Sequence, residues 1–362
     1  MQQRRADTTF EGPGPVGESR GEEEPRAAVV TGGTGFIAAH LIQALVDKGW
    51  RVRTCGRSSR PDSLRPEVDY LSVDLTGDEP LEPLFDEMTH LFHLAGLSSS
   101  FASKDEMYRA NVDGTENLMR AAVASGVQRA LLMSTSSIYG KDVQLPQPVP
   151  EDVEPHPSPG YAGSKWQSEQ VAWGFADKGL PLIVLRPASV YGPGAVKLVA
   201  STILDAAIER FAGLDTFAVP AEQIELRLVH SDDVVDACLH LVERDEAVGR
   251  AFNLISGVYP TNHEVAEVIA ADLGLDLEFS DDPDRGLSYE ERSQVRDRML
   301  AEGMREGILL KEERVRLLKK YNPNNRLSLD ALAEVGFQPR VTDIRQSIPA
   351  NIRWYQDQRW II

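Results

Sequence analysis

The sequence predicts an α/β protein with a doubly wound parallel sheet and a smaller C-terminal lobe. Three observations support this prediction. From Ala27 onward, short apolar runs alternate with helical patterns, as in parallel strands joined by crossover helices. The glycine-rich run TGGTGFIA at 31–38 follows the first apolar run and opens an amphipathic segment, which indicates a strand, a tight turn and a helix. After Pro193 the alternation becomes irregular, which indicates that a second architecture begins there.

The strands of the main sheet are expected in six short apolar runs. These are Ala27 to Thr31, Arg51 to Cys55, Tyr70 to Val73, Leu91 to Leu94, Ala130 to Ser134 and Leu182 to Arg186. Between the fourth and the fifth run, the spacing predicts one long helix over Asp105 to Ser125. The segment from Gln144 to Pro159 is rich in proline and acidic residues, so we expect a surface loop that leads into a helix at Tyr161.

The C-terminal part mixes helical and strand patterns. Helices are expected near Val196 to Phe211, Asp232 to Glu243 and His263 to Leu273, and short strands near Arg227 to Val229 and Ala251 to Leu254. The segment from Ser288 to Lys320 is dense in charge and has apolar residues at loosely helical spacing. It predicts an inserted helical pair within an insertion at about 284–322.

Composition excludes several classes of function. The net charge of −18 argues against a nucleic-acid partner, because phosphate binding needs clustered lysine and arginine. No apolar run is long enough for a membrane span, and the N-terminus lacks the apolar core of a signal peptide. The two cysteines are far apart, and the seven histidines lack metal-binding spacings, so no metal site is expected. These features favour a cytoplasmic protein with a small-molecule substrate.

The glycine-rich turn predicts a site for the pyrophosphate of a dinucleotide. Gly32 permits the tight turn, and Gly35 allows phosphates to approach backbone N–H groups. Ala38 keeps the helix close to the strand. Phe36 and Ile37 begin that helix, whose N-terminus favours a negative charge, so they are expected to contact the cofactor as well.

The run YAGSK at 161–165 adds reactive groups to this prediction. It places the phenol of Tyr161 and the ammonium of Lys165 one helical turn apart on the same face of a helix. Taken with the glycine-rich turn, the pair indicates hydride-transfer chemistry.

The expected organisation therefore has three parts. Residues 1–26 are rich in glycine, proline and glutamate and are expected to form a disordered tail. Residues 27–187 are expected to form a Rossmann-type dinucleotide-binding domain. Residues 188–362 are expected to form a mixed α/β substrate-binding lobe, with the chain free to cross between the two lobes.

These motifs, in this order, resemble the extended short-chain dehydrogenase/reductase family, also called the NAD-dependent epimerase/dehydratase family. The likeness extends over most of the chain from residue 27. Further family-like runs are DLTGD at Asp74, HLAG at His93, NVDGTENLMRAA at Asn111, MSTSSIYG at Met133, RPASVYGPG at Arg186 and VHSDDVVDA at Val229.

The resemblance implies a role for each reactive residue. Tyr161 would exchange a proton with a substrate hydroxyl or carbonyl, while the nicotinamide exchanges the hydride. Lys165 would lower the pKa of that phenol and hold the nicotinamide ribose. Thr135 would hydrogen-bond the reacting oxygen, with Ser134 and Ser136 as neighbours able to share this task. An ordinary polar strand end is the alternative interpretation of these hydroxyls.

The resemblance also implies which residues line the cofactor and the substrate. Asp74 and Leu75 would lie near the adenine, and Ala95 and Gly96 near the ribose and pyrophosphate. Asn111 would support the active-site strand and helix. Further expected contacts are made by Pro187 near the nicotinamide and by Ser136, Ser137 and Ser189 on the substrate.

One departure from the family concerns the choice of cofactor. NAD-preferring Rossmann proteins usually carry an acidic residue at the end of the second strand, where it binds the adenosine 2′-hydroxyl. Here Gly56 stands in that place, followed by Arg57, which is suited to pair with a phosphate, and then by Arg60. The sequence therefore favours NADP over NAD.

Other departures concern the substrate. Nucleotide-sugar members usually have asparagine where this chain has Ser189, and arginine where it has Leu226. Arg227 lies one position away, so on a strand its side chain faces the other side unless a bulge intervenes. Ser136 and Ser137 stand where 4,6-dehydratases carry Asp-Glu, which argues against that subclass.

The leading hypothesis is an NAD(P)-dependent oxidoreductase that interconverts a secondary alcohol and a ketone on a sugar-like or natural-product substrate. Its rival is an epimerase of nucleotide-diphosphate sugars with tightly bound NAD. A dinucleotide-binding sensor or scaffold is the alternative outside enzymology. By analogy with the family, a homodimer is expected through the long helices at 105–125 and 161–178.

Overall fold

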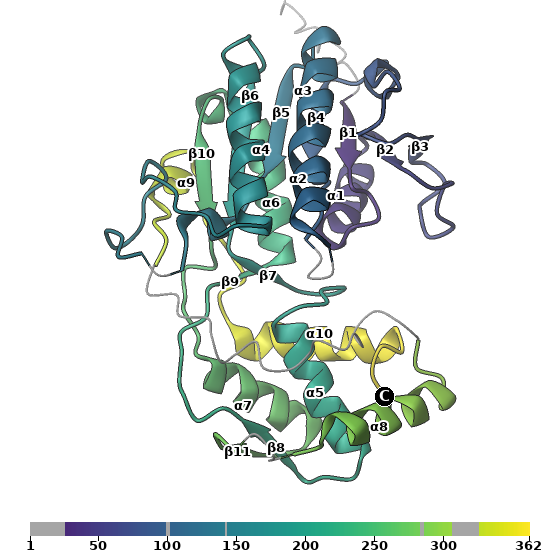
Figure 1. Ribbon diagram of the computed structural model, residues 1–362, viewed down its shortest axis with the longest axis vertical. Coiled ribbons are helices and arrows are strands. Elements are labelled where there is room, and N and C mark those ends of the chain that lie inside the picture. Colours follow the sequence, from purple (N-terminus) through teal and green to yellow (C-terminus); the bar gives the residue numbers. More distant parts are fainter. Residues whose placement is uncertain (1–25, 99–101, 142, 283–285, 306–325) are drawn as a thin grey trace, which may run out of the picture.

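The main sheet has seven parallel strands in the order β3-β2-β1-β4-β5-β6-β10 (Figure 1). The computed structural model describes residues 26–98, 102–141, 143–282, 286–305 and 326–362. The order reverses between β1 and β4, so their carboxyl ends flank the crevice in which doubly wound folds bind nucleotides. The strands are β1 Ala27–Thr31, β2 Arg51–Gly56, β3 Asp69–Ser72, β4 His90–His93, β5 Arg129–Met133, β6 Leu182–Pro187 and β10 Ala251–Leu254.

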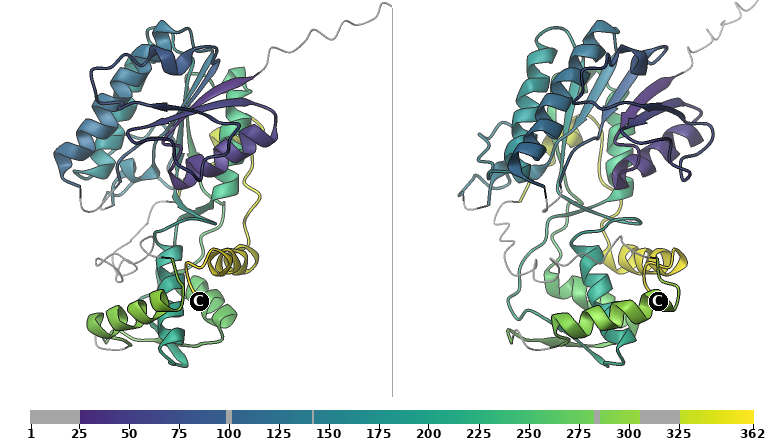
Figure 2. Two further views of the ribbon diagram at one scale, coloured as in Figure 1. Left: turned by 90° about the vertical axis from the view of Figure 1, so that its right-hand side faces the viewer. Right: turned by 45° about the vertical axis from the view of Figure 1, so that its right-hand side comes forward.

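Helices cover both faces of this sheet (Figure 2). Side chains along β1 alternate: Ala28 and Val30 join the core beneath α1 and α6, and Val29 joins the core beneath α3 and α4. All of β1 is buried, as expected for a parallel strand that is covered on both sides. The four helices are α1 Phe36–Asp47, α6 Ser231–Val242, α3 Gly114–Ala124 and α4 Tyr161–Ala176.

The sequence prediction of a doubly wound parallel sheet is confirmed. Each of the six expected strands is present, with bounds shifted by one residue at most. The seventh strand, β10, comes from the C-terminal part of the chain and pairs with β6. Helix α6 also returns to this unit and packs against α1. The main sheet and its layers therefore use residues on both sides of position 187.

The helix expected at 105–125 is interrupted. It consists of α2 (Lys104–Tyr108), a π-helical turn (Arg109–Asp113) and α3. Such turns occur mostly inside α-helices and often at functional sites. A single extra residue per turn leaves little trace in the apolar spacing, which is why the sequence predicted one regular helix. The turn contains Asn111, whose side chain reaches the candidate site described below.

The smaller lobe packs four helices around its own apolar core (Figure 1). A parallel pair, β8 and β11, closes one side, and another, β7 with β9, lies where the chain passes between the two units. The elements are α5 Val199–Phe211, α7 Asn262–Leu273, α8 Tyr289–Ala301, α10 Ile344–Asp357, β7 Ser189–Tyr191, β8 Thr216–Val219, β9 Leu228–His230 and β11 Asp276–Phe279. A short helix, α9 (Asp330–Glu334), packs on β10 in the main unit.

Several expectations for the C-terminal part can be compared with these elements. The helices expected at 196–211, 232–243 and 263–273 are present with starts shifted by up to three residues. Of the expected helical pair, α8 is the first member, and most of the rest falls at 306–325, outside the described residues. The predicted tail likewise lies outside them except for Arg26. Within the described ranges, no helix is long and apolar enough to cross a membrane.

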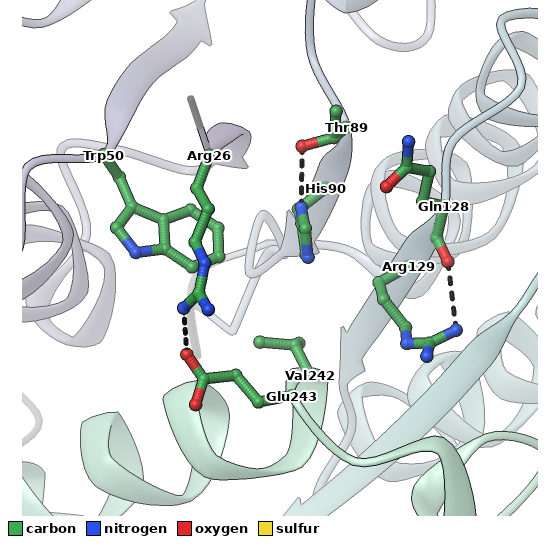
Figure 3. A pocket seen from close by; sticks show the side chains of 8 residues that line it. All are labelled: Arg26, Trp50, Thr89, His90, Gln128, Arg129, Val242 and Glu243. Atoms are coloured by element: carbon green, nitrogen blue, oxygen red, sulfur yellow. Dashed lines mark hydrogen bonds and ion pairs between the residues drawn. The ribbon is translucent and has the colours of Figure 1, made fainter. Parts of the chain in front are cut away.

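A pocket of about 370 Å³ opens at the amino-terminal edge of the sheet, beside the starts of β4 and β5 (Figure 3). Its charged side chains are paired, since Arg26 contacts Glu243 and Arg129 contacts Asp245. Burial, followed by the charges of Arg129 and Arg26, lowers the pKa of His90 to about 4, so this imidazole is neutral. The pocket is therefore a junction of paired charges between α6 and the sheet, at the edge opposite the glycine-rich turn.

Candidate active site

The glycine-rich turn connects β1 to α1 at the carboxyl edge of the sheet. Gly32 has φ +75°, and a Cβ at this position would lie 2.9 Å from the backbone of Ala95, so only glycine fits. Gly35 precedes α1 and donates its N–H to the carbonyl of Gly32 at 2.7 Å. It offers no side chain to cap the helix, and the first turn of α1 contains no acidic residue. The positive end of the helix dipole therefore faces this turn without a negative side chain.

The two residues that begin α1 have different surroundings. Ile37 packs against the core beneath α1 and α6, whereas Phe36 packs against the core of the smaller lobe. A Cβ at Gly194 would lie 3.5 Å from the Phe36 ring, so this ring adjoins the loop that follows β7. Gly33, which the sequence analysis did not single out, packs tightly against Thr54 of β2.

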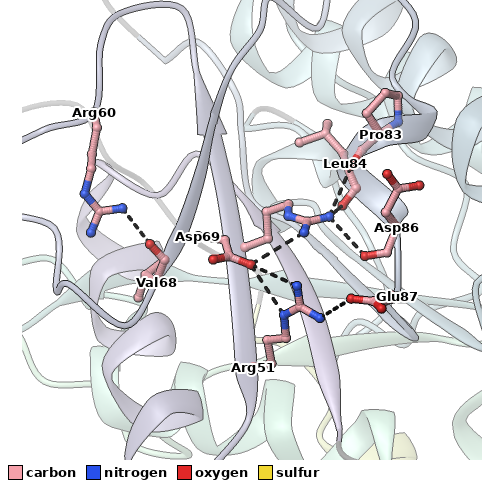
Figure 4. Close-up of polar contacts among 9 residues, drawn as sticks. Arg51, Arg60, Val68, Asp69, Pro83, Leu84, Asp86 and Glu87 are labelled. Carbon is pink, nitrogen blue, oxygen red and sulfur yellow. Dashed lines mark hydrogen bonds and ion pairs between the residues drawn. The ribbon is translucent and has the colours of Figure 1, made fainter.

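The end of β2 presents one arginine to solvent and uses another to hold a loop. The Arg60 guanidinium donates to the carbonyl of Val68 at 2.6 Å (Figure 4). It also donates to the carbonyls of Leu64, at 3.4 Å, and Arg65. Arg60 is therefore engaged in the structure of the loop. Arg57 is exposed, and no hydrogen bond involving it is found within the described part of the chain.

Asp74 lies after β3, near this arginine. Its carboxylate accepts hydrogen bonds from the backbone N–H and the hydroxyl of Thr76, both at 2.9 Å. The pKa of Asp74 is lowered first by the backbone hydrogen bond and to a smaller extent by the charges of Arg57 and Arg109. The carbonyl of Leu75 accepts from Asn117 of α3 at 3.0 Å, which ties this loop to the helix.

Asn111 joins the loop after β4 to α4. Its Oδ1 accepts the N–H of Leu97 at 2.6 Å, and its Nδ2 donates to the Leu97 carbonyl at 3.1 Å and to Ser164 Oγ at 2.8 Å. The side chain is fully engaged and 1% exposed. Asn111 therefore connects the loop after β4 to α4.

Lys165 is the buried cation of the site. It is 4% exposed, and a Cβ built on Gly96 would lie 4.0 Å from its Nζ. Burial lowers the pKa of Lys165 to about 8, although the negative charge of Glu169 opposes this shift. The ammonium thus lies beside Gly96, and Gly32 lies beside Ala95, so α4 and the glycine-rich turn meet at the end of β4.

Tyr161 is the first residue of α4, one turn before Lys165, and is partly exposed. Thr135 follows β5 and caps the short 3₁₀ helix Ser136–Tyr139 by accepting the N–H of Ser137 at 3.2 Å. Its hydroxyl donates to Ser137 Oγ at 3.2 Å. This 3₁₀ helix packs against α4. Ser136 is buried, and Ser137 is half-buried.

A chain of neutral groups lies behind Lys165. His93 contacts Thr31 Oγ1 at 2.7 Å and Thr115 Oγ1 at 2.9 Å, and Thr115 in turn contacts Ser168 at 2.8 Å. Burial and the charge of Lys165 lower the pKa of His93 to about 3, so it is uncharged. Within the described residues, no cluster of three or more histidine, cysteine or acidic side chains is arranged to hold a metal.

The side facing the smaller lobe is formed at β6 and β7. Pro187 ends β6 and is buried, and Ser189 begins β7, where its N–H donates to the carbonyl of Arg227 at 3.0 Å. Leu226 is 1% exposed within the apolar core of the lobe. At the position where nucleotide-sugar members usually carry arginine, this chain therefore has a core residue. Arg227 is buried as well.

Sequence reasoning did not single out three charged residues of this region. Lys197 donates to the carbonyl of Ser98 at 2.7 Å and so connects the smaller lobe to the loop after β4. Glu169 and Arg186 form a buried ion pair behind Thr135 and Lys165. A signal existed for Glu169, because it follows Lys165 by four residues on the same helix face. No local pattern indicates that Arg186, from a different element, is its partner.

The donor set and the shape fit a dinucleotide cofactor. The tight glycine turn, the uncapped start of α1 and the exposed Arg57 suit phosphates, and the buried ammonium of Lys165 suits ribose hydroxyls. These groups lie along one edge of the sheet, at the carboxyl ends of β1, β2, β4 and β5.

Comparison with known proteins places the chain in a family. The model of the NAD dependent epimerase/dehydratase family matches residues 28–254. The GDP-6-deoxy-D-mannose reductase of Pseudomonas aeruginosa is 30% identical over 275 residues, which cover 73% of this chain and 85% of the relative. A 4-hydroxy-2-methyl-3-oxo-4-farnesyl-3,4-dihydroquinoline-1-oxide ketoreductase of Stigmatella aurantiaca is 31% identical, over 51% of this chain and 57% of the relative.

Solved structures share the fold. A UDP-glucose 4-epimerase from Thermotoga maritima, solved with UDP-glucose, superposes with a TM-score of 0.70 at 22% identity, covering 91% of this chain and 99% of that one. The Bordetella bronchiseptica enzyme WbmG, solved with NAD, gives a TM-score of 0.70 at 20% identity, covering 95% and 97%. The chain spans only 50–60% of the length of the first curated relatives it matches. The family model nevertheless covers more than half of the chain, and the protein belongs to the NAD dependent epimerase/dehydratase family of NAD(P)-dependent enzymes.

Proposed function

We propose that the protein is an NAD(P)-dependent oxidoreductase that interconverts a secondary alcohol and a ketone on a sugar-like or natural-product substrate. One observation carries the proposal: the buried ammonium of Lys165 lies beside Gly96, one helical turn from the partly exposed Tyr161. A cation in this place serves the acid/base residue and the cofactor at once. A scaffold without activity has no need of a buried lysine one helical turn from a phenol.

The residues of the site divide the chemistry among themselves. Tyr161 donates a proton to the carbonyl oxygen during reduction and takes it back during oxidation. Lys165 favours the phenolate form of Tyr161 through its charge and donates to ribose hydroxyls. Thr135 donates its hydroxyl to the reacting oxygen and so orients the substrate. A nicotinamide cofactor held by these residues would supply or accept the hydride.

The remaining contacts are assigned to the two ends of the cofactor and to the substrate. The pyrophosphate would be held by Gly32, Gly35, Phe36 and Ile37. Asn111 would keep the loop after β4 in place against α4. The adenosine half would lie against Asp74, Leu75, Ala95 and Gly96, and the nicotinamide half against Pro187. Ser136, Ser137 and Ser189 would face the substrate.

NADP is the proposed cofactor. The exposed Arg57 at the end of β2 is suited to a 2′-phosphate, and no acidic side chain at Gly56 is present to repel it. Related structures have been solved with NAD, which is the form expected for the rival activity of a nucleotide-sugar epimerase. The buried Leu226 argues against that rival, since it removes one expected contact to a sugar pyrophosphate.

The relatives suggest the substrate class. The two curated relatives described above are named as reductases, one of a GDP-linked deoxysugar and one of a farnesylated quinoline oxide. The second name includes a ketone on a ring, and the first names a sugar. We also propose a homodimer through the outer faces of α3 and α4, by analogy with the family, which multi-angle light scattering would test.

The decisive experiment identifies the bound nucleotide and the reaction together. The purified protein is denatured and the released nucleotides are identified, and melting temperatures are then measured with NADP, NAD and nucleotide sugars. Stabilisation by NADP, exchange of the cofactor, and oxidation of NADPH in the presence of cyclic ketones are expected. NAD that stays bound and does not exchange, together with interconversion of nucleotide sugars without net oxidation, would overturn the proposal in favour of the epimerase.

A further inference from the structure

Glu169 is a fully buried carboxylate one helical turn after Lys165. It is 0% exposed, and four donor atoms from three residues surround it. Oε2 accepts from Ser134 Oγ at 2.8 Å and from Arg186 Nε at 3.2 Å. Oε1 accepts from Arg186 Nη2 and from Trp173 Nε1 at 3.4 Å. Every acceptor position is thus used by a donor that favours the ionised carboxylate.

These contacts link the elements that carry the proposed catalytic residues. Ser134 immediately precedes Thr135 at the end of β5, and Arg186 immediately precedes Pro187 in β6. Glu169 itself lies on α4, which carries Tyr161 and Lys165. One side chain therefore fixes the helix against both strand ends.

Arg186 is in turn held from the other side. Its Nη1 donates to the hydroxyl of Tyr139 and to the carbonyl of Glu151, both at 2.8 Å. The Tyr139 hydroxyl donates to Asn253 Oδ1 at 2.9 Å, in β10. The guanidinium therefore has acceptors on both sides, with Glu169 on one and Tyr139 and the Glu151 carbonyl on the other.

The charge of Glu169 also acts on Lys165. Burial destabilises the Lys165 ammonium, and Glu169 is the charged group that opposes this effect. Tyr161 lies one turn before Lys165 on the same helix, and His93 on β4 is neutral because burial and the charge of Lys165 lower its pKa to about 3. Within the described chain, Glu169 is therefore the negative charge placed to keep the ammonium protonated.

We propose that Glu169 is a positioning residue of the active site, whose carboxylate both keeps Lys165 charged and holds α4 against the strand ends that carry Thr135. The proposal rests on the function proposed above only for the role of Lys165. The effect of the Glu169 charge on the protonation of Lys165 is measurable without a substrate.

The test is the pH dependence of cofactor affinity. Dissociation constants of NADH and NADPH are measured by fluorescence between pH 7 and pH 10, with Tyr161→Phe present in every variant so that the phenol does not titrate. Affinity is expected to fall as the pH rises past about 8, where Lys165 loses its proton. Adding Lys165→Met should abolish this transition, which identifies the titrating group.

Glu169→Gln keeps the shape and removes the charge. It should move the midpoint of the transition to lower pH by roughly one unit or more, the usual effect of losing an adjacent opposite charge. Ser134→Ala is the matched control, because it removes one hydrogen bond to Glu169 and leaves the charge. The midpoint of Ser134→Ala should stay at the original pH. Glu169→Asp keeps a negative charge, so its midpoint should lie much closer to the original pH than that of Glu169→Gln.

Glu169→Gln leaves Arg186 buried without its partner, which is a severe cost to folding. If that variant does not fold by circular dichroism, Glu169→Gln with Arg186→Met removes both charges and carries the same test. An unmoved midpoint in a folded variant would overturn the proposal. So would a uniform loss of affinity at every pH, which is the mark of a merely structural role. Failure of the oxidoreductase proposal would show in turnover and leave this transition in place.

Discussion

The hydroxyl of Tyr70 occupies the space that a side chain on Gly56 would need. A Cβ built on Gly56 lies 2.8 Å from this oxygen, which itself donates to the carbonyl of Ser58 at 2.7 Å. An acidic residue at the end of β2 would therefore have to push aside the Tyr70 hydroxyl, which belongs to the neighbouring strand. The packing of β2 against β3 thus disfavours the acidic residue by which Rossmann proteins select NAD.

Arg57→Ala should weaken NADPH binding about 10- to 100-fold and leave NADH binding nearly unchanged. The reason is the loss of a charge-assisted contact to the 2′-phosphate, which NADH lacks. Fluorescence titration of both cofactors against both proteins measures the effect. Tighter binding of NADH by the unaltered protein, with no loss of NADPH affinity on the substitution, would contradict the NADP assignment.

Gly56→Asp should turn the preference toward NADH, because the new carboxylate repels a 2′-phosphate. The same change crowds Tyr70, so the single variant is expected to melt at a lower temperature. Tyr70→Phe removes the crowded hydroxyl and is the matched background. The ratio of NADH to NADPH affinity should rise in the double variant, at a melting temperature close to that of Tyr70→Phe alone. An unchanged ratio would show that β2 does not face the adenosine ribose.

Tyr161→Phe should lower turnover by roughly 100-fold or more while cofactor affinity is retained. The substitution removes only the oxygen that exchanges the proton. Steady-state kinetics with the identified substrate, beside a cofactor titration, separate the two effects. Activity within a few-fold of the original would exclude Tyr161 as the acid/base residue.

Lys165→Met should impair both turnover and cofactor binding, because one ammonium serves the phenol and the ribose. The two losses are measured on the same preparation as kcat and as the cofactor dissociation constant. The apoprotein should not be destabilised, since burying the ammonium is costly and methionine fills similar space. Unchanged cofactor affinity would refute the double role.

Glu209→Gln should alter the pH dependence of stability. Arg292 of α8 donates to Glu209 and to Asp205 of α5, each at 2.9 Å, while Oε2 of Glu209 is buried and finds no hydrogen-bond partner among the described residues. Burial raises the pKa of Glu209 to about 7. Between pH 4.5 and about 7, the folded protein therefore holds a proton on Glu209 that the unfolded chain has already released. The stability that this proton contributes is fully present at low pH and is lost as the pH rises through 7.

Unfolding free energies from urea titrations at pH 5 and pH 8 provide the measurement. Between pH 5 and pH 8, the unfolding free energy of the original protein should fall by roughly 1 to 3 kcal/mol more than that of Glu209→Gln. Glu267→Gln, at an exposed position of α7, should behave like the original protein. Parallel pH profiles for all three proteins would remove Glu209 as the titrating group.

Local patterns predicted the main sheet and the reactive pair, and they failed where distant segments meet. β1 is recognisable because five buried residues lie between a polar tail and a glycine turn. Tyr161 and Lys165 are recognisable because one helix carries both. The partner of β6 is β10, some 65 residues later, and nothing in either run specifies this pairing. The ion pair of Glu169 and Arg186 was not predicted for the same reason, because a contact between two different elements leaves no periodic pattern in the sequence.

The position of β10 has a consequence during synthesis of the protein. Until residue 254 has left the ribosome, β6 is an open sheet edge, and the face beneath α1 lacks the cover that α6 provides. An unpaired apolar edge is a template for wrong pairing with another chain. At a translation rate of about 5–20 residues per second, the roughly 65 residues that separate β6 from β10 leave this edge open for several seconds. We expect fragments that end shortly after β6 to aggregate, and chains released with β10 and α6 in place to fold.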